Sequence, residues 1–118
     1  MIALTLRTAR THFTEAITLL VAYMISQGYE VALDEGMTRV TEKVPQTNHM
    51  PGSLHEIGLA QDIDLYKNGI YLSETEDHAA FGLWWEDYGV EHGLPLACGG
   101  NFKDMDANHY SLRWGGKS

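Results

Sequence analysis

The chain has 118 residues, with 8 basic and 16 acidic side chains and a formal net charge of -8. This length suits one domain over residues 1–118, and a hydrophobic fraction of 44% excludes a wholly disordered chain. The acidic balance, without a cluster of Lys or Arg, argues against nucleic acid as a partner. It also argues against electrostatic capture by an anionic membrane, because both partners need concentrated positive charge.

The sequence also bears on redox compartment and membrane insertion. One cysteine, Cys98, excludes an intrachain disulfide and indicates synthesis in a reducing compartment. The longest apolar run, residues 16–25, is too short to span a bilayer. Arg7 and Arg10 precede it as in a signal peptide, but Glu15 lies at its start and no good cleavage site follows. We therefore expect a buried helix, no signal peptide and no stable membrane insertion.

The first predicted elements are a helix over residues 12–27 and a strand over residues 29–33. The apolar residues of the helix recur at the spacing of one helical face: Phe13, Ile17, Leu20, Val21 and Met24. Gly28 provides the stop, and the alternation that follows it predicts the strand. Residues 34–53 are polar and rich in turn formers, which predicts a long loop.

A hairpin is predicted next, with arms over residues 59–66 and 70–72. Asn68-Gly69 is its turn, because both central residues of a type I′ turn need positive φ. Ser73 followed by Glu76 is a capping box that predicts the start of a second helix, ended by Gly89 or Gly93. Its expected apolar stripe is Ala80, Phe81, Trp84, Trp85 and Tyr88.

The last predicted elements are a turn over residues 99–102 and a half-buried strand. Tyr110, Leu112 and Trp114 alternate with more polar residues in that strand. The order helix, strand, hairpin, helix, strand predicts an α+β fold, with a small antiparallel sheet and flanking helices.

Histidines and acids gather at two places in the sequence. His55 and Asp62 are seven residues apart, which would put them on opposite faces of a regular strand. Gly58 lies between them and can break the pleat, so that both side chains turn to one side. Later, Asp106 stands three residues before His109, a spacing that one tight turn brings together.

His55, Asp62 and His109 together supply two imidazoles and one carboxylate. This set is typical of a catalytic zinc site, where three protein ligands leave the fourth position for water. Asp106 is then the candidate for taking a proton from that water and returning it to a leaving amine. Spacing alone also fits a second interpretation, in which the two histidines are half-buried strand residues with ordinary hydrogen bonds.

The full motif strings resemble those of a known family. Ser53-x-His55-x-x-Gly58-x-Ala60-x-Asp62, followed by Asp106-x-x-His109, is similar to the signature of the D-Ala-D-Ala carboxypeptidase and L-alanyl-D-glutamate endopeptidase superfamily of zinc peptidases. Within it, the chain looks most like short phage peptidases of endolysin type, over most of its length. The similar segments include residues 13–16, 28–31, 58–65 and 67–69, the Gly82-x-x-Trp85 helix, and residues 99–102 leading into residues 106–110.

The resemblance implies a hedgehog/DD-peptidase-like fold and a role for each motif residue. His55, Asp62 and His109 match the zinc ligands, and Asp106 matches the catalytic acid. Arg39 lies where the family carries an Arg that steadies the substrate carbonyl or the developing oxyanion, a task suited to a permanently charged planar donor. Ser53 is expected to hydrogen-bond a substrate carboxylate or the backbone of the metal site.

The chain departs from the family just before the Gly-Gly pair. The family often has Trp there, whereas this chain has Cys98. A thiol at this place could be a fourth ligand, which would close the site and make the zinc structural. We expect instead a small apolar packing residue.

The implied activity is hydrolysis of the L-Ala–D-Glu bond of peptidoglycan stem peptides by a monomeric zinc peptidase that lyses a phage host. The protein would be made in the host cytoplasm and act on the wall after the membrane is permeabilised. Two alternatives stay open. One is a D-Ala-D-Ala carboxypeptidase or dipeptidase, and the other is a non-catalytic, zinc-stabilised wall-binding module.

Overall fold

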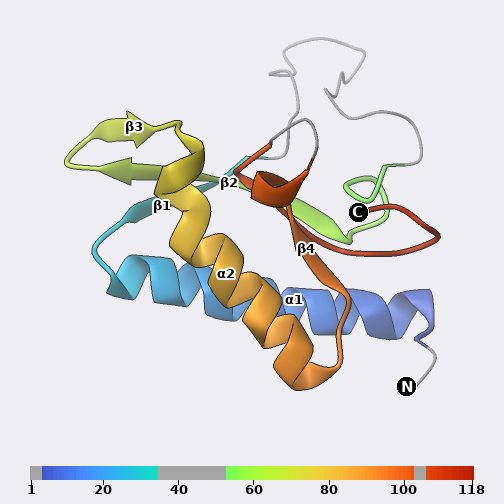
Figure 1. The fold of residues 1–118 in the computed structure, drawn as a ribbon. Coiled ribbons are helices and arrows are strands. Elements are labelled where there is room, and N and C mark those ends of the chain that lie inside the picture. Colours follow the sequence, from blue (N-terminus) through green and yellow to red (C-terminus); the bar gives the residue numbers. More distant parts are fainter. Residues whose placement is uncertain (1–3, 35–52, 103–105) are drawn as a thin grey trace, which may run out of the picture.

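The computed structural model describes residues 4–34, 53–102 and 106–118. They form two α-helices on one side of an antiparallel five-stranded sheet (Figure 1). In chain order the elements are α1 (Leu6–Ser26), β1 (Glu30–Asp34), β2 (Ala60–Lys67), β3 (Ile70–Leu72), α2 (Thr75–His92), β4 (Leu96–Cys98), the 3-10 helix η1 (Gly99–Asn101) and β5 (His109–Leu112). The predicted α+β class with a small antiparallel sheet is confirmed.

Helix α1 begins at Leu6, well before the predicted start at residue 12. The reason is a cap that the hydrophobic pattern does not reveal. The Thr5 hydroxyl accepts a hydrogen bond from the backbone N of Thr8 at 3.2 Å, and the Thr8 hydroxyl accepts one from the backbone N of Thr5 at 3.0 Å. The predicted apolar face is confirmed, since Phe13, Leu20 and Met24 are buried.

Strand β2 is the centre of the sheet, whose order is β1-β2-β5-β4, with β3 also paired to β2. The predicted hairpin is confirmed: Asn68 and Gly69 have φ of 53° and 77°, as the tight turn between β2 and β3 requires. Along β2 the side chains alternate between faces. Ile63 and Leu65 are fully buried in the core, whereas Asp62 lies on the opposite face.

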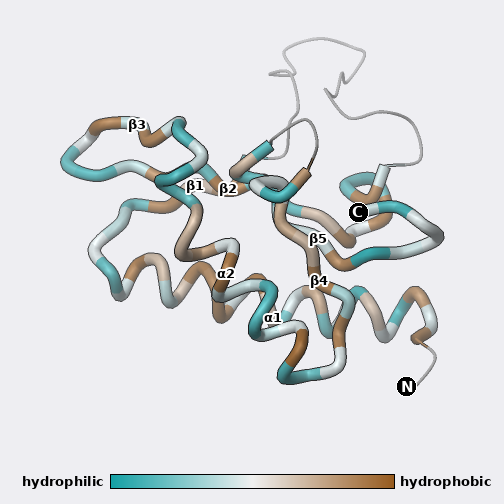
Figure 2. Tube along the Cα trace, in the orientation of Figure 1, coloured by the Kyte–Doolittle hydropathy of each residue, from teal (hydrophilic) through white to brown (hydrophobic). Residues whose placement is uncertain are grey.

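Helix α2 begins at Thr75, and the predicted capping pair was wrong by one residue. Asp77, rather than Glu76, reaches back, and its Oδ2 accepts a hydrogen bond from the backbone N of Glu74 at 2.9 Å. The helix ends at His92 and is capped by Gly93, whose φ of 66° is left-handed. Figure 2 shows apolar and polar residues interspersed along both helices.

One buried tryptophan joins the two layers of the fold. The Trp85 indole N–H donates to the carbonyl oxygens of Ala97 at 2.9 Å and Ser111 at 3.1 Å. Its ring also packs edge-on against Phe13 of α1 and Tyr110 of β5. Helices α1 and α2 and the sheet therefore share one core.

Strand β5 differs from its prediction in exposure. It lies between β2 and β4, so all four of its residues are buried and it is not half-exposed. Strand β4 was not predicted at all, because three residues show no usable alternation. Among the described residues, no helix is long and apolar enough to cross a membrane.

Candidate metal centre

The register of two central strands brings Asp62 and His109 together. Strands β2 and β5 are antiparallel, and these two residues lie directly opposite each other. Side chains of such a pair share one face of the sheet and lie close together. This face is the one turned away from the core, which leaves the pair outside the hydrophobic layer that Ile63 and Leu65 fill.

His55 reaches the same place from a turn rather than from a strand. Residues 54–58 form this turn just before β2, and it closes with a hydrogen bond from the Leu59 backbone N to the Leu54 carbonyl at 2.9 Å. Gly58 adopts a φ of 77° at its end. The glycine therefore serves a tight turn, not the bend within a strand that the spacing predicted. Arg10 of α1 holds the turn by donating to the Ile57 carbonyl at 2.6 Å.

Three ligand atoms converge on one point. His55 Nε2 lies 3.2 Å from His109 Nδ1 and 3.5 Å from Asp62 Oδ1. His109 Nδ1 lies 3.4 Å from the same carboxylate oxygen. These three residues could hold a metal ion, since their ligand atoms all lie within 4.8 Å of one another.

Two unpaired buried atoms test whether this group fits a cation. Asp62 Oδ1 and His109 Nε2 are buried and have no hydrogen-bond partner among the residues that the structure describes. Buried polar atoms are nearly always paired, so both need an explanation. A divalent cation between the rings would satisfy Asp62 Oδ1, whereas a hydrogen bond between the two histidines leaves it without one. The Asp62 carboxylate therefore fits a metal better than the ordinary hydrogen bonds of the alternative interpretation, whereas a metal on His109 Nδ1 leaves His109 Nε2 without a partner in the described residues.

Asp106 stands at the rim of this centre. Its Oδ2 lies 3.9 Å from His109 Nδ1, and its side chain is 55% exposed. Two backbone hydrogen bonds of 2.9 Å fix the segment, one from Asp106 N to the Gly99 carbonyl and one from His109 N to the Asp106 carbonyl. The candidate acid, Asp106, and the candidate ligand, His109, are therefore positioned by the same short stretch of backbone.

The backbone at Asp106 passes so close to Gly99 that only a glycine fits there. A Cβ atom at Gly99 would lie 1.8 Å from the carbonyl oxygen of Asp106 and 2.9 Å from Cβ of His109. No side chain fits there without displacing the segment. At Gly100 a Cβ would meet nothing closer than Thr75 Cγ2 at 3.9 Å. Only the first glycine of the Gly-Gly pair is therefore needed for packing.

Asp64 shares the face of Asp62 but lies outside the metal group. Its Oδ1 accepts hydrogen bonds from Asn108 Nδ2 at 3.2 Å and from the Tyr71 hydroxyl at 3.5 Å. Burial and the nearby charge of Asp34 raise the pKa of this carboxyl. The geometry thus separates two acids that strand periodicity could not.

Cys98 and Ser53, which the structure describes, are not part of the metal group. Cys98 packs against α2, because a Cβ on Gly82 would lie 2.9 Å from its Sγ, and burial raises the pKa of its thiol. Ser53 has a buried hydroxyl oxygen with no hydrogen-bond partner in the described part of the chain. Arg39 lies outside the described residues. The roles of Ser53 and Arg39 stay predictions.

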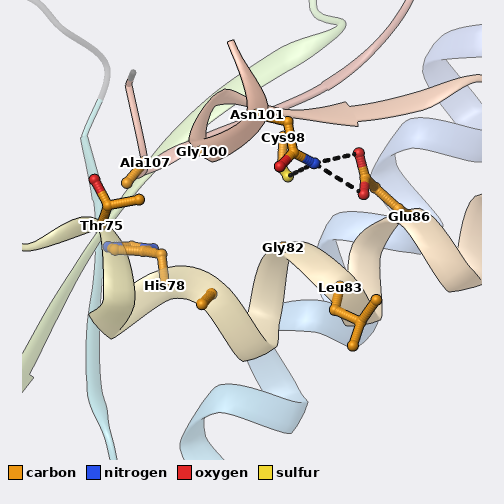
Figure 3. Close-up of a pocket in the computed structure, with 10 residues that line it drawn as sticks. Thr75, His78, Gly82, Leu83, Glu86, Cys98, Gly100, Asn101 and Ala107 are labelled. Atoms are coloured by element: carbon orange, nitrogen blue, oxygen red, sulfur yellow. Dashed lines mark hydrogen bonds between the residues drawn. The ribbon is translucent and has the colours of Figure 1, made fainter.

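A groove that the sequence did not reveal runs from Asp106 along α2. It consists of two cavities, of about 190 and 260 Å³, which share Thr75, His78 and Ala107. The smaller cavity includes Asp106, and the larger one ends at Glu86 and Asn101 (Figure 3). A signal did exist, because positions 75, 78, 82 and 86 share one face of a helix.

Comparisons with known protein families, with curated proteins and with solved structures find no match to this chain. The evidence for a metal site is therefore the arrangement of His55, Asp62 and His109 alone. The family resemblance rests on the two motif strings and on the similar segments around them.

Proposed function

We propose that this chain is a zinc peptidase that hydrolyses the L-Ala–D-Glu bond in the stem peptides of bacterial peptidoglycan. The observation that carries the proposal is the convergence of His55, Asp62 and His109, with the carboxylate of Asp106 beside them. Two imidazoles and one carboxylate form a ligand set of catalytic zinc, and proton transfer needs a second acid close by. The substrate class and the peptidase fold come from the resemblance of the motif strings.

Zinc is the metal that this ligand set favours, although cobalt and nickel accept similar ligands. When bound, zinc supplies Lewis acidity, which polarises a carbonyl and lowers the pKa of a water molecule. Asp106 Oδ2 accepts a proton from the attacking water and returns it to the leaving amine. Arg39 is the predicted donor to the oxyanion that develops on the substrate carbonyl.

The groove beyond Asp106 favours an endopeptidase over a carboxypeptidase. Because Asp106 gives its proton to the leaving amine, the groove that continues from it lies on the leaving-group side. From Thr75 to Glu86, α2 rises about 16 Å, at 1.5 Å per residue. A carboxypeptidase releases one amino acid, which needs roughly 3.5 Å of extended chain. The groove offers room for several residues.

The biological role that goes with this activity is lysis of a phage host. The protein is made in the host cytoplasm and reaches the peptidoglycan once the membrane has been permeabilised. A monomer suffices for the proposed chemistry, because every residue assigned to the centre comes from one chain.

Mass spectrometry of digested wall tests the proposal. Purified Gram-negative peptidoglycan is incubated with the zinc-loaded protein, with and without a chelator. We expect new stem peptides that begin at D-Glu, glycan strands that keep L-Ala, and no cleavage when the chelator is present. Asp106→Asn should retain zinc and lose activity by roughly 10²- to 10⁴-fold, the usual contribution of a general acid–base group.

Three other results would contradict the proposal. Release of free D-Ala would identify a carboxypeptidase. Absence of chelator-sensitive cleavage by a folded, zinc-loaded sample would favour the wall-binding module. Full activity of Asp106→Asn would show that another group carries the proton.

A further inference from the structure

Glu86 is a half-buried carboxylate at the far end of the groove. Both of its oxygens accept hydrogen bonds from Asn101 Nδ2, at 2.9 and 3.0 Å, which fixes the carboxylate toward the cavity (Figure 3). No Lys or Arg in the described part of the chain pairs with it. A carboxylate that is partly removed from water and lacks a counter-charge attracts a cation from solution.

His78 supplies a hydrogen-bond donor between Asp106 and Glu86. Its Nδ1 lies 2.7 Å from the hydroxyl of Tyr110, and its side chain lines both cavities. Burial lowers the pKa of His78, which favours the neutral ring. A neutral imidazole carries one proton. In the tautomer whose Nδ1 accepts from the Tyr110 hydroxyl, that proton is on Nε2, where it can be donated into the groove.

The spacing of these groups matches a peptide whose second residue carries an amine. His78 and Glu86 are eight residues apart on α2, or about 12 Å. Two extended residues cover roughly 7 Å, and a four-carbon side chain with its ammonium adds roughly 6 Å. The amine of the second residue after the cleaved bond can therefore reach Glu86.

We infer that the groove binds the leaving half of the stem peptide, and that Glu86 selects a diamino acid as the second residue after the cleaved bond. This inference rests on the proposed function, because the leaving half is defined by the cleaved bond. The ammonium of the diamino acid pairs with Glu86, and the carboxylate of the preceding D-Glu accepts a hydrogen bond from His78 Nε2. Asn101 is a positioning residue that orients Glu86.

The test uses two dipeptides that differ by one charge. γ-D-Glu–L-Lys and γ-D-Glu–L-norleucine have side chains of similar length, and neither contains the bond to be cleaved. Both are titrated by NMR into the full-length, zinc-loaded protein. We expect the lysine peptide to bind roughly fivefold to tenfold more tightly, since one charge pair in a partly desolvated site contributes about 1 kcal/mol or more. Glu86→Gln should reduce this preference to less than about twofold.

Glu91→Gln is the matched control, because it removes the same charge from the exposed part of α2 outside the groove. It should keep the preference of the wild type. Equal binding of both peptides, no binding at millimolar concentration, or a preference that survives Glu86→Gln would each overturn the inference. If the protein preferred the lysine peptide but cleaved no wall, the peptidase proposal would be rejected and the role of Glu86 in binding a cation would be kept. Failure of the proposed function and failure of this inference therefore give different results.

Discussion

Asp62 and Asp64 show how strongly the surroundings of a single residue decide its role. Both are acids on the same face of β2. Asp62 lies opposite His109 in the register and reaches two imidazoles, whereas Asp64 accepts hydrogen bonds from Asn108 and Tyr71. A carboxylate that already has two donors has less to gain from a cation than one whose buried oxygen has no hydrogen-bond partner in the described part of the chain.

Replacing each acid by its amide should therefore weaken zinc binding to very different extents. Asp62→Asn removes a direct ligand and should weaken zinc binding by more than about 100-fold, since even groups that only support a ligand contribute roughly 10- to 100-fold. Asp64→Asn should change zinc affinity less than about tenfold. Competition titration with a chromophoric chelator measures both. Similar losses in the two variants would mean that Asp62 is not the ligand.

Spacing in the sequence could not choose between these acids, because residues two apart in a strand face the same way. The resemblance of the motif favoured Asp62, and the register now gives a physical reason for that preference. For a related reason, the sequence alone does not distinguish Glu86 from the exposed acids of α2. Its importance depends on Asn101, which comes from a different element and fixes it at 2.9 to 3.0 Å. A contact of that kind has no signature along the chain.

Among whole elements, those with a clear period were predicted well. The buried face of α1, the turn between β2 and β3, and the existence of α2 all follow from local rules. The existence of β4 and the full burial of β5 could not be predicted from local sequence. Both depend on which strands lie next to each other in the sheet, and long-range packing decides that order. The turn that carries His55 was missed because the dominant cue, Gly58, suits either a bulge or a turn.

The connection from η1 to β5 yields a prediction about two adjacent glycines. Gly99→Ala would place a methyl group 1.8 Å from the Asp106 carbonyl oxygen, so the segment must move. We expect a loss of roughly 1 to 3 kcal/mol in the free energy of unfolding, as for other overpacked sites, and weaker zinc binding as His109 shifts. Gly100→Ala meets nothing closer than 3.9 Å and should stay within about 0.5 kcal/mol of wild type.

Urea denaturation followed by zinc titration measures both effects of the glycine substitutions. Gly100→Ala is the control, since Gly100 lies on the same 3-10 helix but has room for an added Cβ atom. If Gly99→Ala had the stability and the zinc affinity of wild type, the close approach of the Asp106 segment would not exist in solution.

At the scale of the whole molecule, the metal group and the hydrophobic core are separate. The core cluster joins α1, α2 and the sheet through residues such as Phe13, Trp85 and Tyr110, and it contains none of the three ligands. Asp62 and His109 are held in place by the β2–β5 ladder, which needs no metal to form. The domain should therefore fold without zinc, unlike small domains whose metal supplies their folding energy.

Removal of zinc by chelation should leave the far-UV and near-UV circular dichroism largely unchanged and lower the melting temperature. A ligand at 100 times its Kd stabilises the folded state by about 2.7 kcal/mol. For a domain of 118 residues this corresponds to a fall of roughly 10 °C on chelation. Zinc added back should restore both the melting temperature and any wall cleavage. Cooperative unfolding on chelation at 25 °C would instead make zinc a structural element and favour the non-catalytic, wall-binding module.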